Sequence, residues 1–115
     1  PDSRLVPGYA RDYPKTVAGG KVEAIRRFIA PSHGGKDPVL VCGDSNGDYN
    51  MMTELPGLRN ALIINRRSRS NIGRICREGL SDPHSKFLVQ GRDENSGKFI
   101  PWQVVTISRD GRILD

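Results

Sequence analysis

The sequence lacks long apolar runs. No stretch approaches the roughly 20 consecutive apolar residues that a transmembrane helix requires, and no charged start followed by an apolar segment indicates a signal peptide. Hydrophobic residues make up 36% of the 115 residues, and the mean hydropathy is -0.52. We therefore expect no membrane as a partner.

Cysteine is scarce as well. Cys42 and Cys76 are the only two cysteines and lie far apart in the chain, which is too few for a disulfide framework or a zinc site. Cys42 falls inside an apolar run, so we expect it to be a small buried hydrophobic residue. This usage predicts a reducing compartment and a cytoplasmic protein.

The length favours a single domain over residues 1–115 with a modest core. Thirteen glycines and eight prolines indicate many turns. Because the chain starts at Pro1 and not at Met, we expect it to be a processed or truncated piece of a longer protein.

A short apolar run that ends in acids dominates the pattern. Residues 39–42 read Val-Leu-Val-Cys and are followed by Gly43, Asp44, Gly47 and Asp48. A continuous apolar run predicts a strand buried on both faces of a parallel sheet. Ligand sites in such sheets lie just beyond the carboxyl ends of the strands, and paired carboxylates there suit a hard cation such as Mg²⁺ beside a phosphate.

A lysine begins the preceding helix. The apolar residues of segment 21–29 follow helical spacing, and Pro31 is expected to close the helix. Lys21 then stands in the first turn, where a cation costs about 0.3–1 kcal/mol. An anion bound at the helix start would reverse this cost, so we expect Lys21 to face the two acids across a ligand.

The remaining elements follow from periodicity and turn residues. We expect a helix from residue 49 to 55, a buried strand at 61–64, and a helix that carries Ile72, Ile75 and Cys76, is capped by Ser68 or Ser70 and stops at Gly79. Strands at 87–89 and 103–107 are expected to pair as a hairpin around a turn at 93–97. A short strand is also expected near residues 4–6.

Residues 20–25 and 39–52 together resemble the C-terminal half of a haloacid dehalogenase (HAD) superfamily phosphatase, and most closely the branch similar to phosphoserine phosphatase. The family has a lysine at a helix start as its third motif and a strand ending in Gly-Asp-x-x-x-Asp as its fourth. Lys21 and Asp44 match these motifs and stand 23 residues apart, as in that branch. The resemblance covers residues 19–65.

The resemblance implies an α/β fold: a partial Rossmann-like parallel sheet flanked by helices, over about residues 19–80, with a C-terminal β-hairpin extension over about 86–115. It also implies Mg²⁺-dependent hydrolysis of a phosphomonoester through an aspartyl-phosphate. Asp44 would be the direct metal ligand, and Asp48 would be a second ligand or would orient a metal-bound water. Lys21 would neutralise the nucleophile and the phosphoryl group. From residue type alone, we expect Asn46 and Ser45 to contact the substrate phosphate.

The nucleophile motif of the family, Asp-x-Asp-x-[Thr/Val], is absent from the sequence. We therefore expect the chain alone to be inactive and to need a missing N-terminal half. Without that half the sheet would have an open edge, for which we expect self-association or a partner strand.

Three alternatives stay open. Asp44, Asn46, Asp48 and Asn50 alternate as in a calcium-binding loop, although an EF-hand would need glycine and glutamate where Tyr49 and Leu55 stand. The basic residues between 66 and 77 could form a nucleic-acid-binding module, but no aromatic residue is interleaved among them, so we do not expect nucleic acid as the partner. The acid pair could also be a helix cap alone, with Ser45 or Asp48 as the N-cap.

Overall fold

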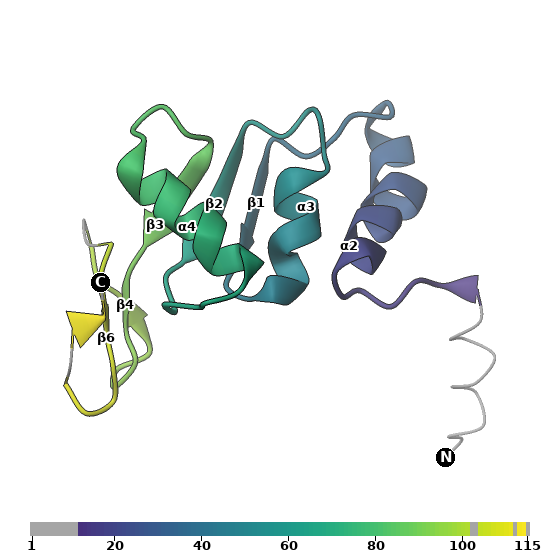
Figure 1. Ribbon diagram of the computed structural model, residues 1–115. Helices are drawn as coiled ribbons and strands as arrows, with labels where there is room; N and C mark the ends of the chain where they lie inside the picture. Colours follow the sequence, from purple (N-terminus) through teal and green to yellow (C-terminus); the bar gives the residue numbers. More distant parts are fainter. Residues whose placement is uncertain (1–11, 102–103, 112, 115) are drawn as a thin grey trace, which may run out of the picture.

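The protein folds as a mixed α/β structure around a parallel sheet. The computed structural model describes residues 12–101, 104–111 and 113–114. Strands β1 (Leu40–Gly43), β2 (Asn60–Ile64) and β3 (Phe87–Gln90) lie in the order β1-β2-β3, and both pairs are parallel. Figure 1 shows the three strands side by side, with helices beside them. The predicted fold class is therefore confirmed, and the strand at 4–6 lies outside the described residues.

The other elements precede these strands, alternate with them or follow them. The helical segments are α2 (Gly19–Ala24), η1 (Ile25–Ile29), η2 (Ala30–His33), η3 (Asn46–Asp48), α3 (Tyr49–Thr53) and α4 (Asn71–Ser81). The short strands are β4 (Arg92–Asp93), β5 (Lys98–Phe99), β6 (Thr106–Ile107) and β7 (Ile113–Leu114). No helix in the described part of the chain is long and apolar enough to cross a membrane.

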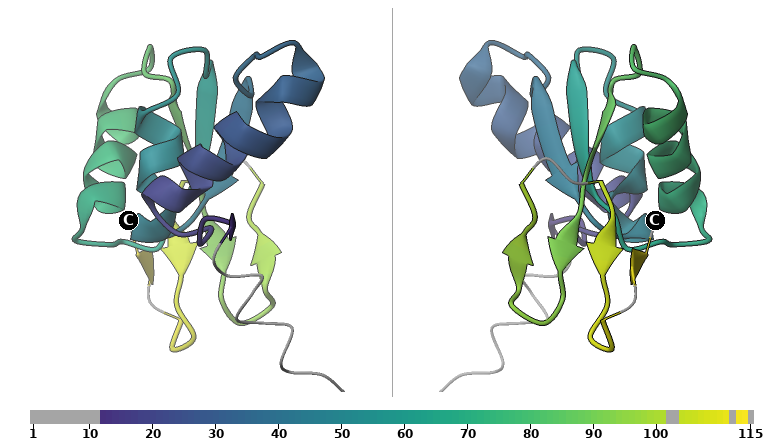
Figure 2. Two further views of the ribbon diagram at one scale, coloured as in Figure 1. Left: turned by 90° about the vertical axis from the view of Figure 1, so that its right-hand side faces the viewer. Right: turned by 90° about the vertical axis from the view of Figure 1, so that its left-hand side faces the viewer.

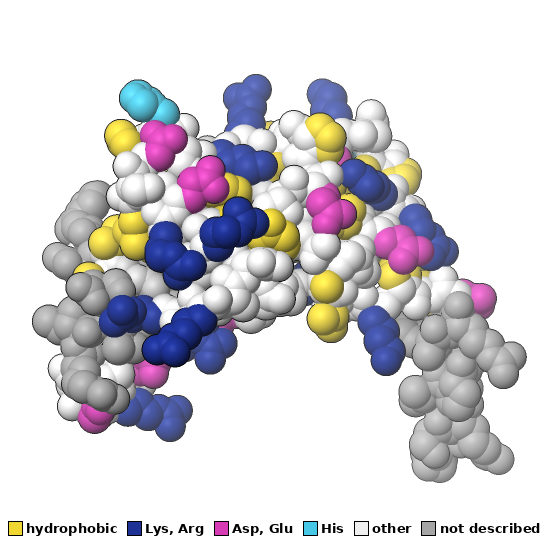
Figure 3. Space-filling view, viewed as in Figure 1, with side chains coloured by type: hydrophobic (Ala, Val, Ile, Leu, Met, Phe, Trp, Pro, Cys, Tyr) yellow, Lys and Arg dark blue, Asp and Glu magenta, His cyan; other side chains and the backbone are white. Residues whose placement is uncertain are grey.

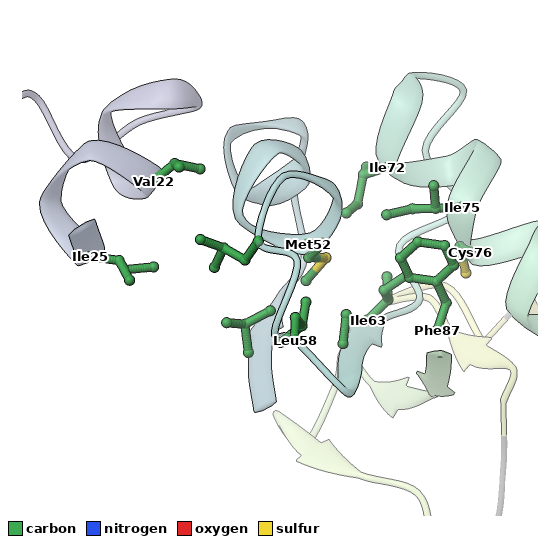
Figure 4. Packing of buried hydrophobic residues seen from close by; sticks show 12 residues of the cluster. Val22, Ile25, Met52, Leu58, Ile63, Ile72, Ile75, Cys76 and Phe87 are labelled. Carbon is green, nitrogen blue, oxygen red and sulfur yellow. The ribbon is translucent and has the colours of Figure 1, made fainter. Parts of the chain in front are cut away.

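The core lies between one face of the sheet and the helices α3 and α4. Val41, Ala61 and Phe87 point to this face, and each is at most 8% exposed. They pack with apolar residues of the helices, as Figure 4 shows for Met52, Ile72, Ile75 and Cys76 among others. Alternate residues of a strand point to the same face of a sheet. This buried face therefore takes up only every second residue of each apolar run.

The opposite face of the sheet is open within the described residues. Leu40 and Leu88 are about half exposed, and Cys42 is exposed. The register places Cys42, Leu62 and Leu88 in one row across this face. The predictions that residues 39–42 are buried on both faces and that Cys42 is buried were therefore wrong for this chain, because the described helices α3 and α4 cover the other face.

Two predicted helix ends were also wrong. The helix that starts at Gly19 widens to a π-helix in η1 and tightens to a 3₁₀-helix in η2, ending before Gly34 at φ 68°. Pro31 lies in the first turn of η2. Proline is tolerated there because a backbone N–H in the first turn would have no partner within the helix. Gly79 lies inside α4 and does not end it. A glycine is needed there because the Phe87 carbonyl oxygen occupies the space of a Cβ.

A second, small sheet follows the main one, in the order β5-β4-β6-β7. Its hairpin joins β4 to β5 around residues 94–97, while β3 belongs to the main sheet. The predicted pairing of 87–89 with 103–107 was therefore wrong, because β3 instead continues the parallel ladder; Gln103 lies outside the described residues. Figure 2 shows the small sheet below the main one in both side views.

Candidate functional site

The Lys21 ammonium meets the Asp48 carboxylate beyond the end of β1. Lys21 Nζ donates to Asp48 Oδ1, although the two residues are 27 positions apart in sequence. Lys21 stands in the first turn of α2, as predicted, and α2 packs beside α3, which begins directly after Asp48. The structure thus brings together the two predicted site residues that lie furthest apart in the chain.

The other oxygen of Asp48 closes the turn after β1. Asp48 Oδ2 accepts hydrogen bonds from the backbone N–H of Asp44 at 3.0 Å and of Ser45 at 3.1 Å, and from Ser45 Oγ at 3.2 Å. Burial of Asp48 raises the pKa of its carboxyl, but the hydrogen bond from Lys21 and those from the turn outweigh this and hold the pKa below its ordinary value. Asp48 is therefore an ionised, fully engaged carboxylate.

Gly43 makes the position of Asp48 possible. A Cβ on Gly43 would lie within 2.6 Å of Asp48 Oδ2, which is far inside normal contact. The glycine that ends β1 therefore lets the Asp48 side chain fold back over the strand end. This close approach explains why a glycine follows the apolar run.

Asp44 faces a different partner. Its side chain is 38% exposed, and its Oδ2 lies 3.3 Å from Arg66 Nη1. Arg66 follows β2, whose carboxyl end neighbours that of β1 in the parallel sheet. We did not single out Arg66 as a partner of Asp44 from the sequence, although the adjacency of two strand ends could have identified it. Asn46 is exposed on the same turn and lines a hollow with Asp44 and Arg66.

These positions divide the predicted site residues into two groups. Lys21 and the buried Asp48 form a partly buried ion pair, whereas Asp44 and Asn46 lie at an accessible surface. Within the described ranges, no three His, Cys, Asp or Glu side chains gather as a ready-made metal cage. Of the two predicted metal ligands, Asp44 has an accessible carboxylate, whereas both carboxylate oxygens of Asp48 accept hydrogen bonds.

A larger cavity opens beside Asp44. It has a volume of about 450 Å³ and lies between the end of β2, the loop at 65–69 and one side of α4. Figure 3 shows Lys and Arg side chains gathered over α4 and the loop before it. The cavity is lined by Asp44, Ile63, Ile64, Asn65, Arg66, Arg67, Ser68, Arg69, Ile72, Gly73, Cys76, Arg77 and Leu80.

The buried side chain of Asn65 anchors the loop at 65–69. Asn65 Nδ2 donates to the Val104 carbonyl at 2.8 Å, and its Oδ1 accepts from the Arg67 N–H at 3.0 Å. The Asn65 carbonyl accepts from the buried Thr106 hydroxyl. The loop is thus tied to the small C-terminal sheet, a connection that the sequence analysis did not predict because the partners lie about 40 residues apart.

We compared the chain with known proteins, and one solved structure has a similar fold. No family model and no curated protein matches the chain. A solved structure of a functionally unknown protein from Anaerococcus prevotii DSM 20548 is similar, with 29% sequence identity and a TM-score of 0.64. The match covers 79% of this chain but only 23% of that protein, so this chain spans about a quarter of the relative's length.

Proposed function

We propose that this chain forms part of a Mg²⁺-dependent phosphomonoester phosphatase similar to the HAD superfamily, with its nucleophile outside the chain. The observation that carries the proposal is the Lys21–Asp48 pair at the carboxyl end of β1, beside the accessible Asp44. The sequence motifs that resemble the family thus coincide with a site at the sheet edge where such folds bind ligands. The low coverage of the longer relative is compatible with a chain that contains part of a larger fold.

The residues present fit a magnesium ion. Mg²⁺ is usually bound by one or two carboxylates together with waters and phosphate oxygens, and Asp44 supplies one accessible carboxylate. Both oxygens of Asp48 are already engaged, which favours Asp48 as the residue that positions Lys21 and the Asp44 turn over a role as second ligand. The ion, when bound, would neutralise charge on the phosphoryl oxygens.

Lys21 would act as a fixed positive charge. Its side chain is 30% exposed and its ammonium is held by Asp48, so the side chain is anchored but still accessible to a ligand. A preorganised cation of this kind stabilises negative charge that develops during phosphoryl transfer. Asp48 stays ionised at neutral pH and keeps Lys21 in place.

The calcium-loop alternative has less support. Two of its four alternating residues are turned to other partners: Asp48 bonds to Lys21 and to the turn, and the Asn50 side chain donates to Glu54. The cap interpretation, in contrast, is compatible with the proposal, because the Asp48 carboxylate accepts from the Ser45 N–H while it binds Lys21.

The test is phosphatase activity of the complete protein that contains this chain. With p-nitrophenyl phosphate as substrate, we expect turnover to require Mg²⁺ and Asp44→Asn to abolish it. Arg59→Gln is a suitable control, because Arg59 is exposed and directly precedes the central strand β2, at the strand end opposite to the one that Arg66 follows. Unchanged Mg²⁺-dependent turnover in Asp44→Asn would reject the proposal.

A further inference from the structure

The cavity between β2, its following loop and α4 carries an excess of positive charge. Four of its lining residues are arginines, at positions 66, 67, 69 and 77, and Asp44 is its one acidic residue. The Arg66 guanidinium is paired with Asp44. Arg69 and Arg77 are exposed and form no hydrogen bond or ion pair with a described residue, so their donors are available to an anion.

The inner wall of this arginine pocket is apolar. Ile63, Ile72 and Cys76 form its buried base, and Leu80, which is 43% exposed, stands at its rim. Burial raises the pKa of the Cys76 thiol, which therefore stays neutral. A ligand that fills the pocket needs a carbon-rich body for this wall and negative charge for the arginines. The volume of about 450 Å³ falls in the range of small-molecule sites.

The loop that bears the arginines is held in place before any ligand arrives. Gly73 of α4 packs directly against the Ser68 carbonyl, which leaves no room for a Cβ. Arg67 has a φ of 52°, an uncommon conformation for a residue other than glycine, and its N–H is bound by the buried Asn65. A fixed loop lowers the entropy lost when a ligand binds.

We propose that the arginine pocket binds a small organic phosphate, with the organic body on the apolar wall and the phosphate on Arg69 and Arg77. Guanidinium groups suit phosphate because they donate parallel hydrogen bonds to two of its oxygens. The pocket adjoins the proposed phosphatase site through Asp44, but binding at Arg69 and Arg77 needs neither Lys21 nor a divalent cation, so it can be tested apart from phosphatase activity. A pocket of this size without interleaved aromatic residues favours a small ligand over a nucleic acid strand.

The experiment is calorimetric titration of this chain in the presence of EDTA, with AMP as the probe. Adenosine and inorganic phosphate represent the two halves of the probe. We expect AMP to bind about tenfold more tightly than either half, since both the wall and the arginines contribute. Replacement of both Arg69 and Arg77 by glutamine should weaken AMP binding by about tenfold or more, whereas Arg59→Gln should leave it unchanged.

A second variant tests the apolar wall. Leu80→Glu introduces charge at an exposed rim position and should weaken AMP binding without changing the thermal midpoint. The proposal is overturned if AMP binds no better than phosphate, or if Arg59→Gln weakens binding as much as the double substitution. Preferential binding of a single-stranded oligonucleotide, with affinity that rises with its length, would also overturn it in favour of a nucleic acid interface.

Discussion

At the scale of single residues, Asp48 performs two tasks with two oxygens. Oδ1 accepts a hydrogen bond from the Lys21 ammonium on α2, and Oδ2 accepts hydrogen bonds from the backbone N–H groups of Asp44 and Ser45 after β1. A buried carboxylate is stable only when its charge is compensated in this way. The Asp48 carboxylate therefore links α2, the end of β1 and the start of α3.

The pair predicts a loss of stability in acid. The pKa of Asp48 is lowered in the folded protein, and that of an aspartate in an unfolded chain is about 3.9. The stabilisation is thus present above about pH 4 and is lost as the pH falls through the lower, folded value. We expect Asp48→Asn to reduce the fall in unfolding free energy between pH 6 and pH 3, measured by urea denaturation.

The control for this experiment is Glu23→Gln. Glu23 pairs with Arg27 on an exposed helix face, where an ion pair contributes little, so the acid dependence should match that of the unmodified chain. A wild-type acid dependence in Asp48→Asn would show that Asp48 is not the titrating group.

A second prediction at this scale concerns Gly43. Substitution by alanine places a Cβ against the Asp48 side chain, so the carboxylate must move and its hydrogen bonds to the turn must lengthen. We expect Gly43→Ala to lower the unfolding free energy by about 1–3 kcal/mol, measured by denaturant titration. Gly19→Ala is the matched control, since nothing lies within 4 Å of its Cβ position; an equal loss in both variants would contradict the steric argument.

At the scale of elements, the loop after β2 depends on the small C-terminal sheet. Thr106 is fully buried and donates to the Asn65 carbonyl, while Asn65 fixes the Arg67 N–H. The loop is therefore held in place by hydrogen bonds to residues about 40 positions later in the chain. This connection gives the small sheet a role in shaping the arginine pocket.

The substitution Thr106→Val tests whether the loop after β2 depends on the small sheet. The substitution keeps the shape of the side chain but removes the hydroxyl, which leaves the Asn65 carbonyl without that donor. We expect the unfolding free energy to fall by about 1–3 kcal/mol, and amide hydrogen exchange at Arg67 to accelerate. Thr53→Val serves as the control, because its hydroxyl only bonds back within α3; unchanged exchange at Arg67 in Thr106→Val would contradict the coupling.

The helices and strands that were predicted correctly from the sequence are those with a local apolar pattern. The strands at 39–42, 61–64 and 87–89 and a helix after Ser70 were predicted because apolar periodicity is a local signal. The Ser70 side chain, however, makes no capping hydrogen bond. The place of 87–89 in the parallel sheet and the interior position of Gly79 were missed, since both depend on packing between distant segments. Lys21 and Asp48 were predicted as site residues by motif, whereas the role of Asn65 required the fold, because its partners Val104 and Thr106 lie about 40 residues later.

At the scale of the whole molecule, one face of the main sheet is open within the described residues. β1 lies at the edge of the sheet in the described chain, Val39 and Leu40 are more than half exposed, and Leu88 is nearly so. An unpaired strand with apolar neighbours readily pairs with another chain. The surface that remains uncovered is thus apolar on the side away from α3 and α4.

We therefore expect this chain to self-associate when it is isolated. Light scattering should give a mass that rises with concentration, and Leu40→Lys should reduce the rise, because a lysine on an edge strand opposes pairing. Leu80→Lys is the control on the far side of the fold. A concentration-independent monomer would contradict this expectation and would leave the open edge without a role in assembly.

The central claim, that Asp44 holds a divalent cation next to Lys21, is tested most directly by Mn²⁺ binding to the complete protein, followed by electron paramagnetic resonance. We predict one bound Mn²⁺ that Mg²⁺ displaces, with affinity lowered about tenfold or more in Asp44→Asn and unchanged in Arg59→Gln. Equal Mn²⁺ affinity in the unmodified protein and in Asp44→Asn would contradict the claim.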